Sequence, residues 1–121
     1  MSNDLGRALS ILRIAVGAAA WAAPGIAARV LGDRPAARTS LPLVLRLFGA
    51  RDVGMGVGYL QASSQDQRDR LLLIGMGVDA LDGVASVLAQ RRGQLPARLA
   101  TPFALTAVAA VVTAAVARRQ Q

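Results

Sequence analysis

Residues 45–60 read LRLFGARDVGMGVGYL, and this stretch decides the fold. It is apolar and rich in glycine, yet Arg51 and Asp52 stand in its middle. Charged groups in apolar surroundings are costly unless oppositely charged groups pair with them. The next apolar segment, Leu71 to Ala89, carries two further aspartates near its middle and supplies the expected partners. The two stretches together predict helices that pack around a buried arginine–aspartate cluster.

The composition favours a membrane protein. Hydrophobic residues make up 54% of the 121 residues, the mean hydropathy is +0.42, and aromatic residues contribute only 3%. Alanine and glycine supply much of the apolar character, and small residues are favoured where membrane helices pack closely. At this length we expect residues 1–121 to form a single integral membrane domain. A water-soluble, alanine-rich bundle is the competing interpretation, but the long apolar run at 99–117 suits a soluble surface poorly.

The residue types narrow the chemistry. All 14 basic residues are arginine, all 7 acidic residues are aspartate, and histidine, cysteine, lysine and glutamate are absent. An imidazole base, a thiolate, a Schiff base and the usual zinc sites are thereby excluded, and we expect no metal and no cofactor. The net charge of +7 comes mostly from arginines that flank apolar segments, with few aromatic residues to stack on bases. Membrane lipids, and not nucleic acid, are therefore the expected partners.

The hydropathy pattern predicts an all-α, four-transmembrane-helix bundle with a short interfacial helix after the first span. The expected spans are Ala8 to Ala23, Pro42 to Gln61, Leu71 to Gln90 and Leu99 to Ala117. The last is uncharged and has the roughly 18 to 20 residues that a span requires. Gly25 to Leu31 is too short to span and too apolar for a free loop, so we expect it at the interface, ending at Gly32. The chain is thus expected to be a multi-pass protein of the cell membrane with both termini on one side.

Polar segments are expected to connect the spans. Asp33 to Ser40 and Arg91 to Arg98 are predicted loops. The block Ser63 to Arg70 is a predicted connector, in which Ser64 or Asp66 caps the next helix. Arginines are nearly equal in number on the two sides, so the positive-inside rule assigns no orientation.

Helical spacing brings the polar and small residues of each span onto one face. The third span has its stripe at spacings of four, three and four residues: Gly75, Asp79, Asp82 and Ser86. The second span has a similar stripe: Gly49, Asp52, Gly56 and Tyr59. The first span offers Gly6, Ser10, Arg13 and Gly17, and the fourth offers Thr106, Ala109 and Thr113. Both carboxylates of the third span are therefore expected to face the same neighbouring helix.

Five charged residues lie at similar depth. At a rise of ~1.5 Å per residue they fall ~8 to 17 Å from the side of the termini, near the middle of a ~30 Å hydrocarbon core. Arg13 is expected to reach Asp79 and Asp52, which leaves Arg51 for Asp82. Two guanidinium groups then face three carboxylates, so one carboxylate is expected to hold a proton at neutral pH. These five residues are the candidate catalytic, acid–base cluster.

Three functions remain open for this cluster. It binds or processes a lipophilic small molecule by carboxylate acid–base chemistry, or it exchanges protons for a small solute in a proton-coupled carrier. Alternatively, it is a static salt-bridge network in a structural membrane subunit. The first function needs an apolar pocket open to the bilayer, the second needs a polar path to both surfaces, and the third needs neither.

Residues outside the cluster have simpler expected roles. Gly54 and Gly58 have GxxxG spacing and offer a face for a homo-oligomer. Tyr59 and Trp21 lie near helix ends, where aromatic residues usually anchor a helix at the interface. Arg46 starts near the opposite surface and is expected to extend its guanidinium to it.

The layout resembles that of the DoxX-like small membrane proteins and related uncharacterised bacterial four-helix families. The resemblance is carried by Arg13 in the first span and by the break and short amphipathic piece at Pro24 to Gly32. The motif RLFGARDVGMG at Arg46 to Gly56 and an aspartate in the third span complete it. The resemblance covers most of the chain, implies a polytopic bacterial membrane protein and assigns no catalytic residues.

Overall fold

The computed structural model describes residues 4–30 and 41–120, and the regular secondary structure within these ranges is entirely helical. The helices are α1 (Asp4–Ala22), α2 (Pro24–Val30), α3 (Leu41–Gln61), α4 (Gln65–Arg91) and α5 (Ala97–Arg119). Within the described ranges, three helices are long and apolar enough to cross a membrane: α1, α4 and α5. Helix α3 has 21 residues, but Arg46, Arg51 and Asp52 interrupt its apolar sequence.

The start of α4 differs most from the sequence prediction. Ser63 to Arg70 is predicted to be a connector, but the helix begins at Gln65, so most of this block forms its first turns. Ser64 is the N-cap, as predicted, and its hydroxyl accepts a hydrogen bond from the backbone N–H of Gln67. The connector prediction is wrong because polar residues such as glutamine and arginine form a helix readily once a cap is present.

The other helix boundaries differ by a few residues. Helix α1 begins at Asp4, and α5 runs from Ala97 to Arg119, which reduces the predicted loop at 91–98 to residues 92–96. Helix α2 covers most of the predicted short helix. Its predicted end at Gly32 and the predicted loop at 33–40 lie outside the described residues.

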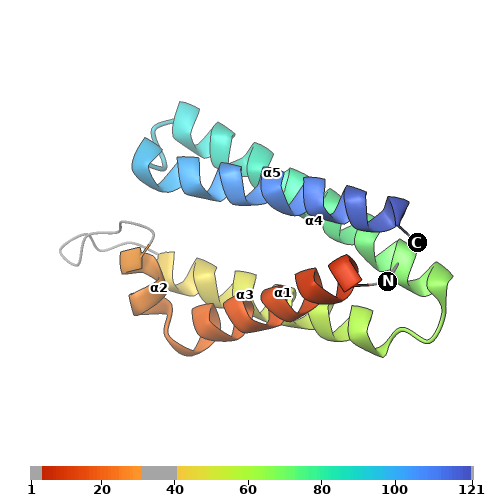
Figure 1. Ribbon diagram of the computed structural model, residues 1–121. Coiled ribbons are helices and arrows are strands. Elements are labelled where there is room, and N and C mark those ends of the chain that lie inside the picture. Colours follow the sequence, from red (N-terminus) through yellow and green to blue (C-terminus); the bar gives the residue numbers. More distant parts are fainter. Residues whose placement is uncertain (1–3, 31–40, 121) are drawn as a thin grey trace.

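The long helices form two hairpins. Helix α1 packs along α3 and α4 packs along α5, whereas contacts between the two hairpins are sparse. Figure 1 shows that the hairpins converge at the end where both termini lie and diverge towards α2 and the turn between α4 and α5. Helix α2 packs beside α3 at this open end. The backbones of the two hairpins therefore lie closest near the termini.

Glycine lets α1 and α3 approach backbone to backbone. A Cβ atom on Gly17 would lie 2.6 Å from the carbonyl oxygen of Gly49, and one on Gly49 would overlap the carbonyl oxygen of Gly17. A Cβ atom on Gly56 would lie 2.6 Å from the carbonyl oxygen of Ser10. Gly49 and Gly56 belong to the stripe predicted for this helix, and both are buried. The crossing of α1 and α3 therefore depends on residues without a side chain.

The pair with GxxxG spacing has no such role within the chain. Gly54 is exposed, and a Cβ atom there would meet no atom within 4 Å. A Cβ atom on Gly58 would lie 3.8 Å from a methyl group of Leu71 in α4. The two glycines do not share one free face, and a homo-oligomer formed through them stays a prediction.

Alanine has the corresponding role between α4 and α5. The buried face of α5 consists of Leu99, Ala100, Ala107, Ala114 and Ala117. Gly83 of α4 lies against this face, because a Cβ atom there would be 3.2 Å from Cβ of Ala107. The face predicted for this helix is wrong, since Thr106 and Ala109 are exposed. Alanine permits closer packing than threonine, and this decides which face of α5 turns inward.

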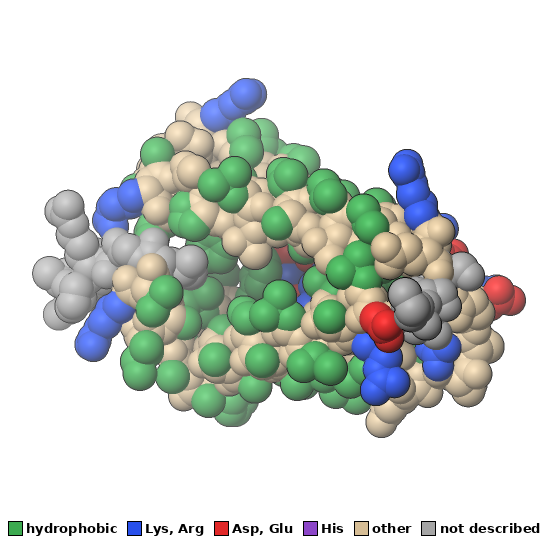
Figure 2. Space-filling model, viewed as in Figure 1, with side chains coloured by type: hydrophobic (Ala, Val, Ile, Leu, Met, Phe, Trp, Pro, Cys, Tyr) green, Lys and Arg blue, Asp and Glu red, His purple; other side chains and the backbone are tan. Residues whose placement is uncertain are grey.

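The outer surface of the hairpins is apolar. Figure 2 shows hydrophobic side chains over both hairpins and charged side chains mainly at the two ends. Leu12, Leu47, Ile74 and Leu105, one from each long helix, are all more than half exposed. Apolar surface of this extent is unusual on a soluble monomer and suits a hydrocarbon environment.

Gly49→Ala is expected to destabilise the protein, because its methyl group would press on the backbone of Gly17 and force α1 away from α3. Overpacking typically costs about 1 to 3 kcal/mol, more than the up to ~1 kcal/mol that alanine gains over glycine in a helix. Gly54→Ala is the matched control in the same helix, with open space around the new methyl group. Thermal unfolding in detergent, followed by circular dichroism, should give a lower Tm for Gly49→Ala only. Equal Tm values would show that the crossing tolerates a side chain.

Candidate functional site

Arg13 of α1 lies at the centre of a buried ionic cluster. Its Nη1 donates hydrogen bonds to Oδ1 of Asp52 at 3.1 Å and to Oδ1 of Asp79 at 3.3 Å, and its Nη2 donates to Oδ2 of Asp79. The two bonds to Asp79 form the fork that suits a carboxylate. The side chains of Arg13 and Asp79 are only 10% and 6% exposed. One guanidinium group therefore ties α1 to both α3 and α4, across the space between the hairpins.

Arg51 of α3 makes a looser second pair. Its Nη2 lies 2.7 Å from Oδ2 of Asp82 and 3.5 Å from Oδ1 of Asp52. These are ion pairs by distance, but their angles are not those of hydrogen bonds. Among the described residues, Nε and Nη2 of Arg51 and Oδ2 of Asp82 are buried atoms without a hydrogen-bond partner. The side chains of Arg51 and Asp82 are 29% and 24% exposed, so this edge of the cluster is more open than the Arg13 side.

Helical spacing explains why the two pairs form side by side. Asp79 and Asp82 lie one turn apart on α4, and both contact arginines of the first hairpin. Asp52 lies on the matching stripe of α3 and is shared by both guanidinium groups. The predicted pairing of all five residues is the observed one. Their catalytic role stays a prediction.

Two aromatic neighbours of the cluster were not predicted. The guanidinium of Arg51 lies over the ring of Phe48, with its carbon 3.9 Å from the ring centroid. The ring of Phe48 also packs against Phe103 of α5, at 6.1 Å between centroids and 52° between planes. The spacing of three residues between Phe48 and Arg51 is the signal in the sequence that indicates the first contact.

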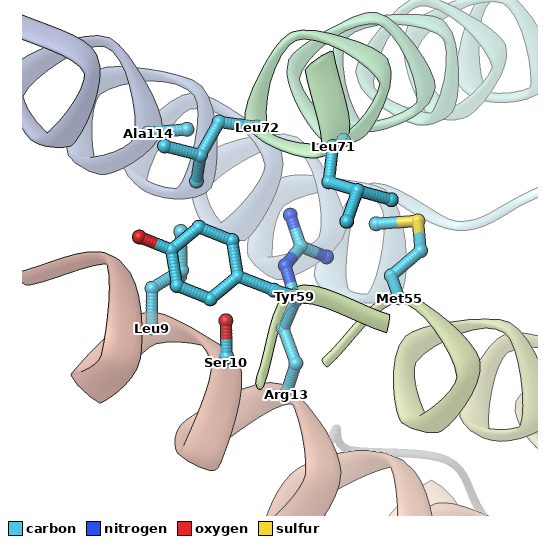
Figure 3. A pocket seen from close by; sticks show the side chains of 9 residues that line it. Leu9, Ser10, Arg13, Met55, Tyr59, Leu71, Leu72 and Ala114 are labelled. Carbon is cyan, nitrogen blue, oxygen red and sulfur yellow. The ribbon is translucent and has the colours of Figure 1, made fainter. Parts of the chain in front are cut away.

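A small cavity of about 20 Å³ adjoins the cluster on the side of the termini (Figure 3). Residues of α1, α3, α4 and α5 line it, and they include Ser10, Arg13, Met55, Tyr59 and Gly75. The predicted interface anchor Tyr59 is in fact buried, with only 3% exposure. Its hydroxyl end lies where a Cβ atom of Gly6 would be. The absence of a side chain at this position of α1 therefore makes room for the ring.

Other charged contacts lie outside the cluster. Nε of Arg46 donates to the carbonyl oxygen of Trp21 at 3.2 Å, and its guanidinium carbon lies 5.7 Å from the centroid of the indole ring. Both side chains are exposed, in agreement with the position expected for Arg46. Arg118 donates two hydrogen bonds to Asp69, at 2.7 and 3.0 Å, and ties the end of α5 to the start of α4. Within the described ranges no group of three or more acidic side chains is arranged to hold a metal ion.

Comparisons of the chain with protein-family models, with curated proteins and with solved structures gave no match. The resemblance to the DoxX-like proteins therefore stays a prediction, and function is inferred from the geometry of the cluster.

Asp79→Asn is expected to destabilise the protein strongly, because it removes the charge that compensates the buried guanidinium of Arg13. Loss of one partner from a buried ion pair typically costs about 3 to 5 kcal/mol. Asp69→Asn is the matched control: it is the same substitution in the same helix, also beside an arginine, but at a side chain that is 39% exposed. Exposed ion pairs contribute little to stability. Detergent melts should therefore show a large fall in Tm for Asp79→Asn alone, and equal tolerance would mean that the deep charges are hydrated separately.

Proposed function

We propose that the chain is a multi-pass membrane protein with four spans, α1, α3, α4 and α5, and with α2 at the interface. The length and apolarity of α1, α4 and α5 support this topology. Helix α3 has the length of a span, and its central charges, Arg51 and Asp52, are paired inside the molecule. Helix α2 has only 7 residues, too few to cross a hydrocarbon core.

Variants with a single introduced cysteine test this topology. The chain has no native cysteine, so no other thiol in it is labelled. Leu105→Cys, on the outer face in the middle of α5, is expected to resist a membrane-impermeant maleimide in intact cells. Of Ser63→Cys and Gln94→Cys, which lie at opposite ends of α4, only one should be labelled, and Gln120→Cys should behave like Ser63→Cys. Labelling of Leu105→Cys as fast as the more reactive of the two end positions would contradict the membrane topology.

The proposed role of the cluster is to bind a lipophilic small molecule and to act on its polar group by carboxylate acid–base chemistry. The observation that carries this role is the partly exposed ion pair of Arg51 and Asp82, whose side chains are 29% and 24% exposed, whereas those of Arg13 and Asp79 are 10% and 6% exposed. In the proposed complex, a ligand hydroxyl group lies beside this pair, accepts a hydrogen bond from the guanidinium of Arg51 and donates one to the carboxylate of Asp82.

The space between the hairpins supports entry from the side. Figure 2 shows a hollow between the two hairpins, with hydrophobic side chains around it and acidic and basic side chains at its base. The sparse contact between the hairpins leaves room there, and the rings of Phe48 and Phe103 offer an apolar surface beside Arg51. An apolar tail lying in this hollow would bring a polar head to the pair of Arg51 and Asp82.

The charge balance of the cluster supports acid–base chemistry. Three carboxylates face two guanidinium groups, so full ionisation leaves one negative charge uncompensated in a low-dielectric interior. Asp79 is held by two bonds from Arg13, and Asp52 is shared by both arginines. Asp82 has the most exposed side chain of the three acids, at 24%. It is therefore the group proposed to exchange a proton with the bound molecule.

A proton-coupled carrier is less well supported, because it needs a polar path to both surfaces. On the α2 side of the cluster the packed interior is apolar and consists of Ala20, Leu45 and Leu99, with Ala27, Leu95 and Phe103 against them. The nearest hydroxyl on that side along α4, of Ser86, donates to the carbonyl oxygen of Asp82. The described residues thus offer no continuous polar path towards that surface.

A photoactivatable diazirine analogue of hexadecanol tests the proposed site in lipid nanodiscs. Labelling of Phe48, which lies against the guanidinium of Arg51, and of Phe103, which packs against Phe48, should saturate and should be displaced by unlabelled hexadecanol. Labelling of Leu12 and Ile74, which are exposed on the outer surface, should not be displaced, because these side chains meet bulk lipid. If labelling of the inner positions is not displaced either, the site does not exist, and the remaining account is a static salt-bridge network in a structural subunit.

Asp82→Asn separates binding by the polar group from simple partitioning into the hollow. Loss of a charged hydrogen-bond acceptor typically costs about 1.5 kcal/mol or more, so hexadecanol should compete about tenfold less well. Labelling by the matching hexadecane diazirine, which has no hydroxyl group, should stay the same. An equal effect on both probes would mean that the substitution alters the hollow and not a hydrogen bond.

A further inference from the structure

The cavity between the cluster and the end with the termini has the size and polarity of a water site. Its volume is about 20 Å³, and a buried water molecule needs roughly 10 to 15 Å³. Two polar side chains that line it are more than nine-tenths buried: Ser10 is 3% exposed and Arg13 is 9% exposed. Figure 3 shows both side chains rising from α1 towards the same space, beside the ring of Tyr59.

Both side chains keep capacity for a further hydrogen bond. The hydroxyl of Ser10 donates to the carbonyl oxygen of Gly6 at 2.8 Å, so its lone pairs can still accept. Arg13 donates three hydrogen bonds to carboxylates of the described residues, out of the five N–H groups of a guanidinium. Its Nη2 borders the cavity, because a Cβ atom on the lining residue Gly75 would lie 3.5 Å from this nitrogen.

We propose that one water molecule binds in this cavity, donates to Oγ of Ser10 and accepts from Nη2 of Arg13. A small space with two polar partners is typical of sites that hold ordered water. Hydration lowers the cost of keeping a guanidinium group at the middle of a bilayer. The water also gives the cluster a partner for proton exchange, whether or not a lipophilic molecule occupies the hollow.

The cavity lies nearer the termini than the ion pairs are. Ser10 precedes Arg13 on α1, and the lining residues Leu72 and Gly75 precede Asp79 on α4. Apolar side chains pack on both sides of this level, around Leu9 and Leu72 towards the termini and around Leu45 and Leu99 towards α2. The proposed water molecule is therefore a separate polar site within an apolar interior.

Ser10→Cys tests the site, because its thiol is the only one in the chain and its S–H stretching band is followed by infrared spectroscopy. After transfer of lipid nanodiscs to D2O, the thiol of a hydrated cavity should exchange rapidly to S–D. Gly75→Ala fills the cavity, and its methyl group would meet Met55 at 3.4 Å and Arg13 at 3.5 Å, which are contacts that leave the ion pairs in place. In the Gly75→Ala background exchange should slow about tenfold or more, because it then requires local opening.

Gly77→Ala is the matched control on the same helix, where a new Cβ atom meets nothing within 4 Å. It should leave the exchange of the Ser10→Cys thiol fast, and equal rates in the Gly75→Ala and Gly77→Ala backgrounds would overturn the water site. If circular dichroism shows that Ser10→Cys does not fold, Ala114→Cys places the same thiol in the cavity lining.

Discussion

The guanidinium of Arg13 holds three helices together at one point. It donates to Asp52 on α3 and to Asp79 on α4 from a position on α1, and the bonds to Asp79 join two hairpins whose backbones make few close contacts. The arrangement depends on the glycine contacts of α1 with α3, which bring the two backbones close enough for one side chain to reach both neighbours. A longer interhelical distance would leave the guanidinium unpaired in an apolar interior, at a cost of several kcal/mol.

The cluster has a closed side and an open side, and the two differ in what they can do. On the closed side, Arg13 and Asp79 are buried and satisfy each other in a forked pair. Buried pairs of this kind add specificity more often than net stability, and here the pair fixes the register between the hairpins. On the open side, Arg51 and Asp82 form an ion pair at 2.7 Å whose side chains are partly exposed. The closed side thus holds the side chains of the open side in a fixed position.

The sequence predicts the cluster well because charged side chains deep in an apolar segment can be stabilised in only a few ways. Spacings of three and four residues place Asp79 and Asp82 on one face of a helix, and an apolar setting requires that arginines come to meet them. These two conditions, together with the depth of each charge along its helix, give the observed pairing. Charge in an apolar helix is therefore a stronger guide to tertiary contacts than apolar residues are.

Packing between similar small residues is what the sequence does not reveal. In α5, alanine occurs on every side, so hydropathy cannot tell the buried Ala107 from the exposed Ala109. The predicted position of Tyr59 is wrong for a related reason. Its burial depends on Gly6 in another helix, where the absence of a side chain leaves room for the ring. The contact between Phe48 and Phe103 likewise joins residues of different hairpins, which local spacing does not connect.

The division of charge between the hairpins bears on how the protein is made. Within the cluster, the first hairpin brings Arg13 and Arg51 against a single aspartate, and the second brings Asp79 and Asp82. If the two hairpins enter a bilayer in the order of synthesis, the first hairpin carries excess positive charge in the bilayer until the second hairpin has been synthesised. Attraction between opposite charges is strong and long-ranged at low dielectric constant, so it would draw the newly inserted hairpin into place. A chain stalled after α3 would therefore keep an uncompensated guanidinium in the membrane, at the energetic cost that a buried, unpaired charge carries.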